Sequence, residues 1–318
     1  MKQSIYFLSF NAFFTIIALF LPSCIHRKQI DKQKLHISPT NITTCQLSPI
    51  HHTPPPVTIW VHGTLMFRTP LYHHIFNKKS SLVHVMSLPE NHHFRLLAST
   101  IKDHDSEHFP LEEFYIFSWS GRLQNKERKD SAEKLSQEII TLISQYKKKY
   151  GFKPIIRIIS HSHGGNVVLN MAALPNAIDN IIIEALVLLA CPVQEETMHL
   201  INSPIFCRIY SLYSSLDMIQ ILAPQFRHID PITTTTKRKR HYKIPPFSSR
   251  IFPPYKHVRQ TKIKINHYPI SHTNFSTTNF VALLPAILNK LDEWHYQTLT
   301  INQYNKYKLL CIYTQQAN

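Results

Sequence analysis

The feature that most constrains the fold is a run of isoleucines that leads into two adjacent glycines. The run consists of Ile155, Ile156, Ile158 and Ile159. Such β-branched residues favour a buried strand, here over 154–160, and 163–174 have the apolar spacing of a helix. The segment between them reads Ser160-His161-Ser162-His163-Gly164-Gly165. The strand and the helix are therefore expected to meet in a tight turn at Ser162.

Glycine is so scarce in this chain that each one is informative. Of 318 residues only five are glycine, namely Gly63, Gly121, Gly151, Gly164 and Gly165. In such a sequence a glycine indicates a backbone requirement that other residues meet poorly. Two of the five lie at the strand-to-helix junction and a third follows His62, so these two places are singled out.

Short apolar runs alternate with helical patterns through most of the chain. Strands are expected over 57–62, 113–120, 154–160, 181–190, 206–214 and 258–266, and helices over 130–150, 163–174 and 279–296. The run 258–266 alternates apolar and polar residues, as an edge strand does. This alternation of strands and helices predicts an α/β fold, with a mainly parallel sheet that carries helices on both faces.

The two ends of the chain depart from this pattern, which gives four predicted segments. Residues 1–24 are typical of an export signal. Residues 25–56 mix charges, Ser, Thr and Pro without apolar periodicity, as a flexible tether does. The globular domain is predicted over 57–296, and 297–318 are predicted to be a C-terminal tail.

The export signal consists of Lys2, an apolar stretch over 5–21 that is short for a membrane span, and Leu21-Pro22-Ser23-Cys24. Its last four residues resemble the lipobox of bacterial lipoproteins, although Pro22 departs from that pattern. The resemblance implies lipidation of Cys24 and an exported protein anchored at a membrane surface. The alternative, an uncleaved N-terminal membrane anchor, is favoured by the basic residues Arg27, Lys28, Lys32 and Lys34.

Composition argues against several classes of function. The chain has 35 Lys and Arg against 19 Asp and Glu, a formal charge of +16, which can attract an anionic membrane surface. The basic runs 147–149 and 237–240 are not interleaved with aromatic residues, so no nucleic-acid partner is expected. The five cysteines lack metal-finger spacing. His161 and His163 straddle the junction of strand and helix, so to bind one ion they would need a favourable loop and further ligands. No metal is therefore expected.

The junction resembles the nucleophile elbow of the α/β-hydrolase superfamily, and within it of bacterial serine esterases and lipases. The resemblance implies that Ser162 is the nucleophile, with small residues two positions away on either side. Gly164 meets this requirement, whereas Ser160 stands where glycine is usual, a mild departure because serine is also small. The elbow also implies that the main-chain N–H of His163, at the start of the helix, stabilises an oxyanion.

A second likeness to the superfamily lies where the strand 57–62 runs into Gly63 and Thr64. This stretch resembles the His-Gly segment that closes the third strand of α/β-hydrolases. It implies a second oxyanion-hole N–H, from Thr64 or Leu65. The whole resemblance covers 57–296 and implies an eight-stranded sheet, of which this chain lacks the first strands.

The acid and the base are expected in the order serine, acid, histidine along the chain. Asp217 lies just beyond the strand 206–214 and is the favoured acid, with a turn or helix N-cap as its other possible role. His272 and His267 both follow the strand 258–266 and compete for the role of base. His272 has the better position, because it precedes the last helix directly.

The resemblance thus implies cleavage of a carboxylic ester, from a small-molecule or lipid acyl substrate, through an acyl-enzyme. Its triad would be Ser162, Asp217 and His272, and it needs no cofactor. The alternative is a catalytically silent, membrane-anchored binding lipoprotein on the same fold, since fold does not imply function. Between acid and base, 245–255 are rich in proline and aromatic residues and form either a lid or a plain surface loop.

Overall fold

The computed structural model describes residues 35–36, 56–64, 80–175, 180–223, 248–296 and 308–314. The chain divides into two compact units, and the following concerns the larger one, His36–Tyr313. The predicted signal with Cys24, and Leu65 of the predicted oxyanion hole, lie outside the described residues. Within the described part, no helix is long and apolar enough to cross a bilayer.

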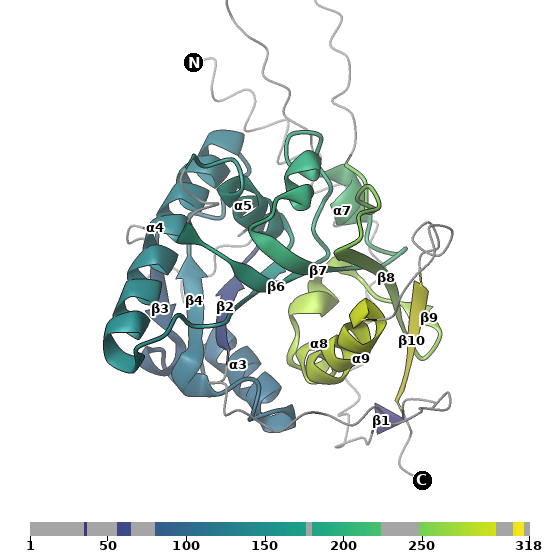
Figure 1. Cartoon of the computed structure of the whole chain (residues 1–318). Coiled ribbons are helices and arrows are strands. Elements are labelled where there is room, and N and C mark those ends of the chain that lie inside the picture. The colour runs from purple at the N-terminus through teal and green to yellow at the C-terminus, as the bar shows by residue number, and fades with distance from the viewer. Residues whose placement is uncertain are drawn as a thin grey trace, which may run out of the picture. The chain divides into compact units, whose positions relative to one another are not determined.

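A mainly parallel sheet forms the centre of this unit, in the order β10-β8-β7-β6-β5-β2-β4-β3 (Figure 1). Every pair from β10 to β4 is parallel, whereas β3 pairs antiparallel with β4, and β9 with β8. The strands are β1 (Leu35–His36), β2 (Val57–Val61), β3 (Ser81–His84), β4 (Phe114–Ser118), β5 (Ile156–His161), β6 (Ile183–Leu189), β7 (Phe206–Tyr213), β8 (Val258–Ile265), β9 (Tyr268–Pro269) and β10 (Lys308–Thr314).

Helices cover both faces of the sheet (Figure 1). One face carries α4 (Asn125–Tyr150) and α5 (His163–Met171), and the other α3 (His93–His104), α8 (Thr278–Val281) and α9 (Leu284–Tyr296). Leu135 and Ile139 of α4 belong to a buried cluster with Ile158 and Leu186 of the sheet. Burying one such side chain contributes roughly 1.5–3 kcal/mol, so this cluster holds the layers together. The shorter helices are η1 (Val85–Ser87), η2 (Leu111–Glu113), η3 (Met198–Asn202), α7 (Met218–Leu222) and η5 (His272–Ser276).

The parallel strands bring distant parts of the sequence to one edge of the sheet. Residues that follow parallel strands lie at the same, carboxyl-terminal edge, where ligands bind in α/β folds. In this chain that edge carries, after β2, β5, β7 and the β8–β9 hairpin respectively, Gly63, Ser162, Asp217 and His272. The candidate residues from the sequence therefore share one end of the fold.

The predicted α/β architecture is confirmed, with a mainly parallel sheet and helices on both faces. The prediction that 258–266 form an edge strand was wrong, because β8 lies between β7 and β10. Alternation of polar and apolar residues describes the two faces of a strand, and it does not indicate whether another strand pairs with its edge. That neighbour, β10, lies within 297–318, the segment predicted as a tail.

The last predicted helix, 279–296, is two helices in the structure. The helix α8 ends at Val281 and α9 begins at Leu284, one residue before Pro285. Proline has no N–H to donate, and its ring is tolerated only in the first turn of a helix. The chain therefore ends one helix and starts another just before Pro285.

Candidate active site

Ser162 occupies a strained turn between β5 and α5. Its backbone has φ 53° and ψ −133°, a region that residues with a side chain rarely adopt. Two hydrogen bonds fix it, because the N–H of Ser162 donates to the carbonyl of Leu189 and the N–H of Gly165 donates to the carbonyl of Ser162. Such a conformation costs on the order of 1–3 kcal/mol and persists only where the surroundings impose it.

The glycines singled out in the sequence lie where other segments of the backbone approach closely. A β-carbon on Gly164 would lie 2.5 Å from the carbonyl oxygens of Val61 and His62. A β-carbon on Gly165 would lie 2.5 Å from the Cys191 sulfur. The first turn of α5 is therefore pressed against the end of β2 and the residues after β6, which only glycine permits.

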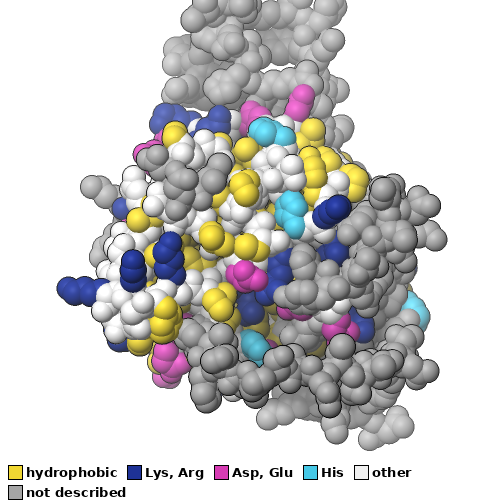
Figure 2. Space-filling model, viewed as in Figure 1, with side chains coloured by type: hydrophobic (Ala, Val, Ile, Leu, Met, Phe, Trp, Pro, Cys, Tyr) yellow, Lys and Arg dark blue, Asp and Glu magenta, His cyan; other side chains and the backbone are white. Residues whose placement is uncertain are grey.

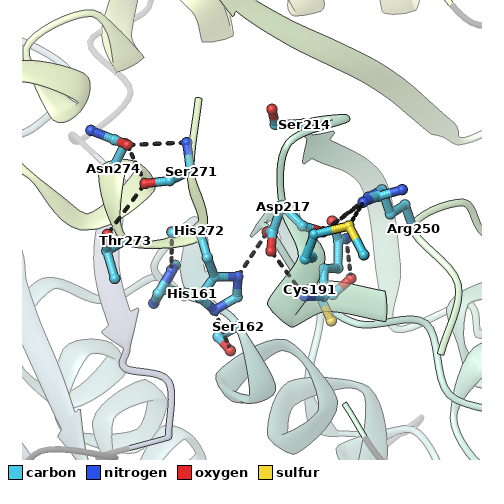
Figure 3. A network of polar contacts seen from close by, with 12 residues as sticks. His161, Ser162, Cys191, Ser214, Asp217, Arg250, Ser271, His272, Thr273 and Asn274 are labelled. Atoms are coloured by element: carbon cyan, nitrogen blue, oxygen red, sulfur yellow. Dashed lines mark hydrogen bonds and ion pairs between the residues drawn. The ribbon is translucent and has the colours of Figure 1, made fainter. Parts of the chain in front are cut away.

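The side chains of Ser162, His272 and Asp217 form one chain of hydrogen bonds (Figure 3). Nε2 of His272 lies 2.9 Å from Oγ of Ser162, and Nδ1 of His272 lies 2.7 Å from Oδ2 of Asp217. All three residues are buried. The structure thus brings together the serine, acid and histidine that the sequence analysis selected.

Asp217 uses its two carboxylate oxygens for two different partners. Oδ2 faces His272, while Oδ1 accepts the main-chain N–H of Gln220 at 2.9 Å and so caps α7. The guanidinium of Arg250 donates twice to the main-chain carbonyl of Asp217. The helix-cap role considered for Asp217 therefore coexists with the contact to His272, and Arg250 ties the described part of 245–255 to the acid.

His267 lies in the turn that joins β8 to β9. Asn266 and His267 both have positive φ, 49° and 67°, as a tight hairpin turn requires. His272 begins η5, whose start is fixed by a capping box between Ser271 and Asn274. Of the two histidines left open by the sequence, the structure places His272 against Ser162.

The predicted oxyanion hole is described in part. His163 is the first residue of α5, so its main-chain N–H stands at a helix N-terminus, which favours negative charge. Thr64 lies just beyond β2, after Gly63, which packs directly against Ser162. The segments of His163 and Thr64 therefore meet at Ser162.

His62 holds the turn after β2, a role that the sequence analysis did not assign. Its Nε2 accepts the main-chain N–H of Trp119 at 3.3 Å, so its proton is on Nδ1, which donates to the carbonyl of Gly63 at 2.7 Å. The indole N–H of Trp119 donates in turn to the carbonyl of His62 at 2.8 Å. Burial lowers the pKa of His62 from 6.5 to about 4, so this ring is neutral.

The two histidines that flank Ser162, His161 and His163, are also kept neutral by burial. Burial lowers the pKa of His161 to about 3 and that of His163 well below its usual value. Arg128 of α4 is buried near His163, and it donates to the carbonyl of Leu123 and to the side chain of Gln194. In the described part of the chain, no three His, Cys, Asp or Glu side chains gather to hold a metal ion. The hydrogen-bonded chain of Ser162, His272 and Asp217 can move a proton between the Ser162 hydroxyl and Nε2 of His272.

The chain matches no family model and no curated protein. Among solved structures it is similar to the phospholipase PlaB from Legionella pneumophila in complex with thio-NAD, with 17% identity and a TM-score of 0.28. That match covers 43% of this chain and 25% of the phospholipase, so it spans a quarter of that protein. The chain is also similar to an arylesterase, with 10% identity, a TM-score of 0.35, and coverage of 92% and 96% of the two chains. At these TM-scores neither similarity carries an argument about the reaction, which rests on the site geometry.

Proposed function

We propose that this chain is a serine hydrolase that cleaves carboxylic esters, with Ser162 as nucleophile, His272 as base and Asp217 as acid. The observation that carries the proposal is the continuous hydrogen-bond chain from Ser162 Oγ through His272 to Asp217 Oδ2, with the serine on a strained strand-to-helix turn. A histidine–aspartate pair that only stabilised the fold would not require a neighbouring serine with a strained backbone.

The first half of the reaction forms an acyl-enzyme. Asp217 accepts a hydrogen bond from Nδ1–H of His272, so the unprotonated Nε2 can take the proton of the Ser162 hydroxyl. Oγ of Ser162 then attacks the carbonyl carbon of the ester. The N–H groups of His163 and of Thr64 or Leu65 stabilise the oxyanion of the tetrahedral intermediate, and each such donor contributes about 10²–10³-fold in rate. The imidazolium of His272 gives its proton to the departing alkoxide.

The second half of the reaction releases the acid. A water molecule replaces the alcohol, His272 takes its proton, and the hydroxide attacks the acyl carbon. The collapse of the second tetrahedral intermediate returns the proton to Ser162. Apart from the ester and the water molecule, each step uses side chains and main-chain groups of this chain.

Labelling with a fluorophosphonate, together with turnover of short-chain p-nitrophenyl esters, tests the proposal. The wild-type protein should be labelled and active, and Ser162→Ala should be unlabelled and fold normally. Loss of a triad member costs several orders of magnitude in kcat. A wild-type protein that folds, takes no label and hydrolyses no ester would refute the enzyme and favour the silent binding lipoprotein.

We also propose that the protein is exported and anchored by lipid on Cys24. The support is the lipobox-like Leu21–Cys24 and the charge of +16, which suits an anionic surface. Lysine and arginine side chains are scattered over the visible face of the folded unit rather than gathered in one patch (Figure 2). Such scatter fits general attraction to a membrane better than a nucleic-acid groove.

Expression of the full chain in a bacterium supplied with labelled palmitate tests this location. Label should be incorporated, and Cys24→Ser should lose it and keep the mass of the uncleaved chain. A wild-type protein that carries no label, retains Met1 and stays with the membrane would instead be held by an uncleaved helix.

A further inference from the structure

His161 stands directly before the nucleophile and reaches the loop that carries the base. It is the last residue of β5, and its neighbour in sequence, Ser160, points into the opposite face of the sheet because side chains alternate along a strand. Nε2 of His161 lies 3.1 Å from the main-chain carbonyl oxygen of His272 (Figure 3). The two imidazole rings lie 4.8 Å apart between centroids, with their planes at 48°.

The partner of His161 determines where its proton is. A carbonyl oxygen only accepts hydrogen bonds, so Nε2 of His161 must carry the proton and donate a hydrogen bond to the main-chain carbonyl of His272. Burial, with His272, His62 and His93 nearby, lowers the pKa of His161 to about 3, so the ring stays neutral. Its other nitrogen, Nδ1, faces the turn after β2, since a β-carbon on Gly63 would lie 3.1 Å from it.

This ring therefore lies between the two segments that must be aligned with Ser162. On one side is the Gly63 turn, which leads to the oxyanion donor, and on the other is the main chain of His272. The bond to His272 joins residues 111 positions apart in sequence. Asp217 fixes Nδ1 of the His272 imidazole by a hydrogen bond. The distance from Nε2 of His272 to Ser162 also depends on where the main chain of His272 lies.

We propose that His161 is a positioning residue, which holds the base within reach of Ser162 by donating Nε2–H to the carbonyl of His272. The inference rests on the proposed hydrolase function. A displacement of about 1 Å in a catalytic group costs on the order of 10²-fold in rate. The bond from His161 stabilises a main-chain position, so its loss affects the chemical step and leaves substrate binding in place.

A matched pair of substitutions isolates the hydrogen bond from the bulk of the side chain. Glutamine and methionine are similar in length and volume, but only glutamine has an N–H donor. In His161→Met the rate constants for ester turnover (kcat) and for fluorophosphonate labelling should fall by about 10–100-fold, with KM within a few-fold of wild type. In His161→Gln both rates should return to within a few-fold of wild type. Thermal unfolding of each variant serves as the stability control.

The outcomes separate the inference from the function on which it rests. Wild-type labelling rates in His161→Met would overturn the role of His161 and leave the hydrolase intact. Equal losses in His161→Gln and His161→Met, with the same fall in melting temperature, would reduce His161 to a packing residue. A folded wild-type protein without labelling or turnover would refute the hydrolase, and the inference with it. Should His161→Met fail to fold, His161→Phe keeps a ring without a donor and gives the same comparison.

Discussion

Gly63 packs against Ser162 so closely that a β-carbon on Gly63 would lie 2.8 Å from the β-carbon of Ser162. The carbonyl oxygen of His161 would lie 3.1 Å from that added atom. These neighbours are a main-chain oxygen and the β-carbon of Ser162, so they cannot move aside as the end of a long side chain can. The turn after β2 and the elbow after β5 therefore form one packed unit.

The Gly63→Ala variant should lose both activity and stability. Overpacking of this kind typically lowers the free energy of unfolding by about 1–3 kcal/mol. If Ser162 shifts to relieve the clash with the new methyl group, kcat should fall by about 10²-fold. Urea unfolding and ester hydrolysis measure the two effects. The control is Gly151→Ala, because Gly151 has φ +81° but nothing within 4 Å of an added β-carbon. That variant should lose about 1 kcal/mol of stability and keep its kcat. Unchanged kcat in Gly63→Ala would contradict the close packing.

The Asp217→Asn variant should separate the two roles of this carboxylate. The amide oxygen can still accept the N–H of Gln220, so the cap on α7 is kept. The amide nitrogen then faces Nδ1 of His272, which must become an acceptor, and the proton moves to Nε2. A ring in that tautomer cannot take the proton of Ser162, so kcat should fall by about 10⁴-fold with little change in melting temperature.

The Asp217→Ala variant completes the comparison. It removes the cap as well, which costs about 1 kcal/mol of additional stability at a helix N-terminus. Activity and melting temperature of the two variants are measured side by side. Substantial activity in Asp217→Asn would show that the contact to His272 is structural only.

The elbow was predictable because its signal is local. A β-branched run, two glycines and a helix pattern follow one another directly within 154–174, and together they force a tight turn at Ser162. The order of acid and histidine came from the resemblance, which selected Asp217 and His272 but left His267 open. Position along the chain favoured His272, and the structure places His272 against Ser162, whereas His267 lies in the turn between β8 and β9.

Other parts of the fold depend on information that no local pattern carries. The place of β10 beside β8 is a long-range pairing, and the role of His62 depends on Trp119, 57 residues further along the chain. The helix α3 is a different case, because its buried residues Phe94, Leu97, Ala98 and Ile101 have helical spacing. The helix α3 was therefore predictable from the sequence, although it was not among the predicted helices.

The two loop histidines should differ sharply in their effect on activity. The His272→Ala variant should match the loss in Ser162→Ala, because the two side chains act as one unit. The His267→Ala variant should keep kcat within a few-fold of wild type, since His267 lies in the hairpin turn with φ 67°. The substitution should also cost little stability, because histidine and alanine both carry the β-carbon that makes positive φ unfavourable. Ester turnover and urea unfolding of both variants provide the measurement, and the reverse ranking of activity would move the base to His267.

Burial of His62 should make stability depend on pH in a defined window. Its pKa is about 4 in the folded protein and 6.5 in a solvated histidine. Between these values the unfolded chain binds a proton that the folded chain does not, so the free energy of unfolding should fall as pH falls from about 6.5 to about 4. The stability that neutral, buried His62 contributes is fully present above about pH 6.5 and is lost below about pH 4. One pKa unit corresponds to about 1.4 kcal/mol, so the change is on the order of 3 kcal/mol.

Replacing His62 by a residue that does not titrate should remove this contribution to the slope. In His62→Asn the free energy of unfolding should fall less steeply between about pH 7 and pH 4 than in wild type, by roughly one bound proton. The variant loses hydrogen bonds to Trp119 and Gly63 and is less stable throughout, so the slopes are compared rather than the values. Urea unfolding at several pH values gives both slopes. Equal slopes in the two proteins would mean that His62 takes up its proton in the folded state as readily as in the unfolded chain. Protonation of the folded ring would remove the nitrogen that accepts the N–H of Trp119, so equal slopes would contradict the contacts of His62 with Gly63 and Trp119.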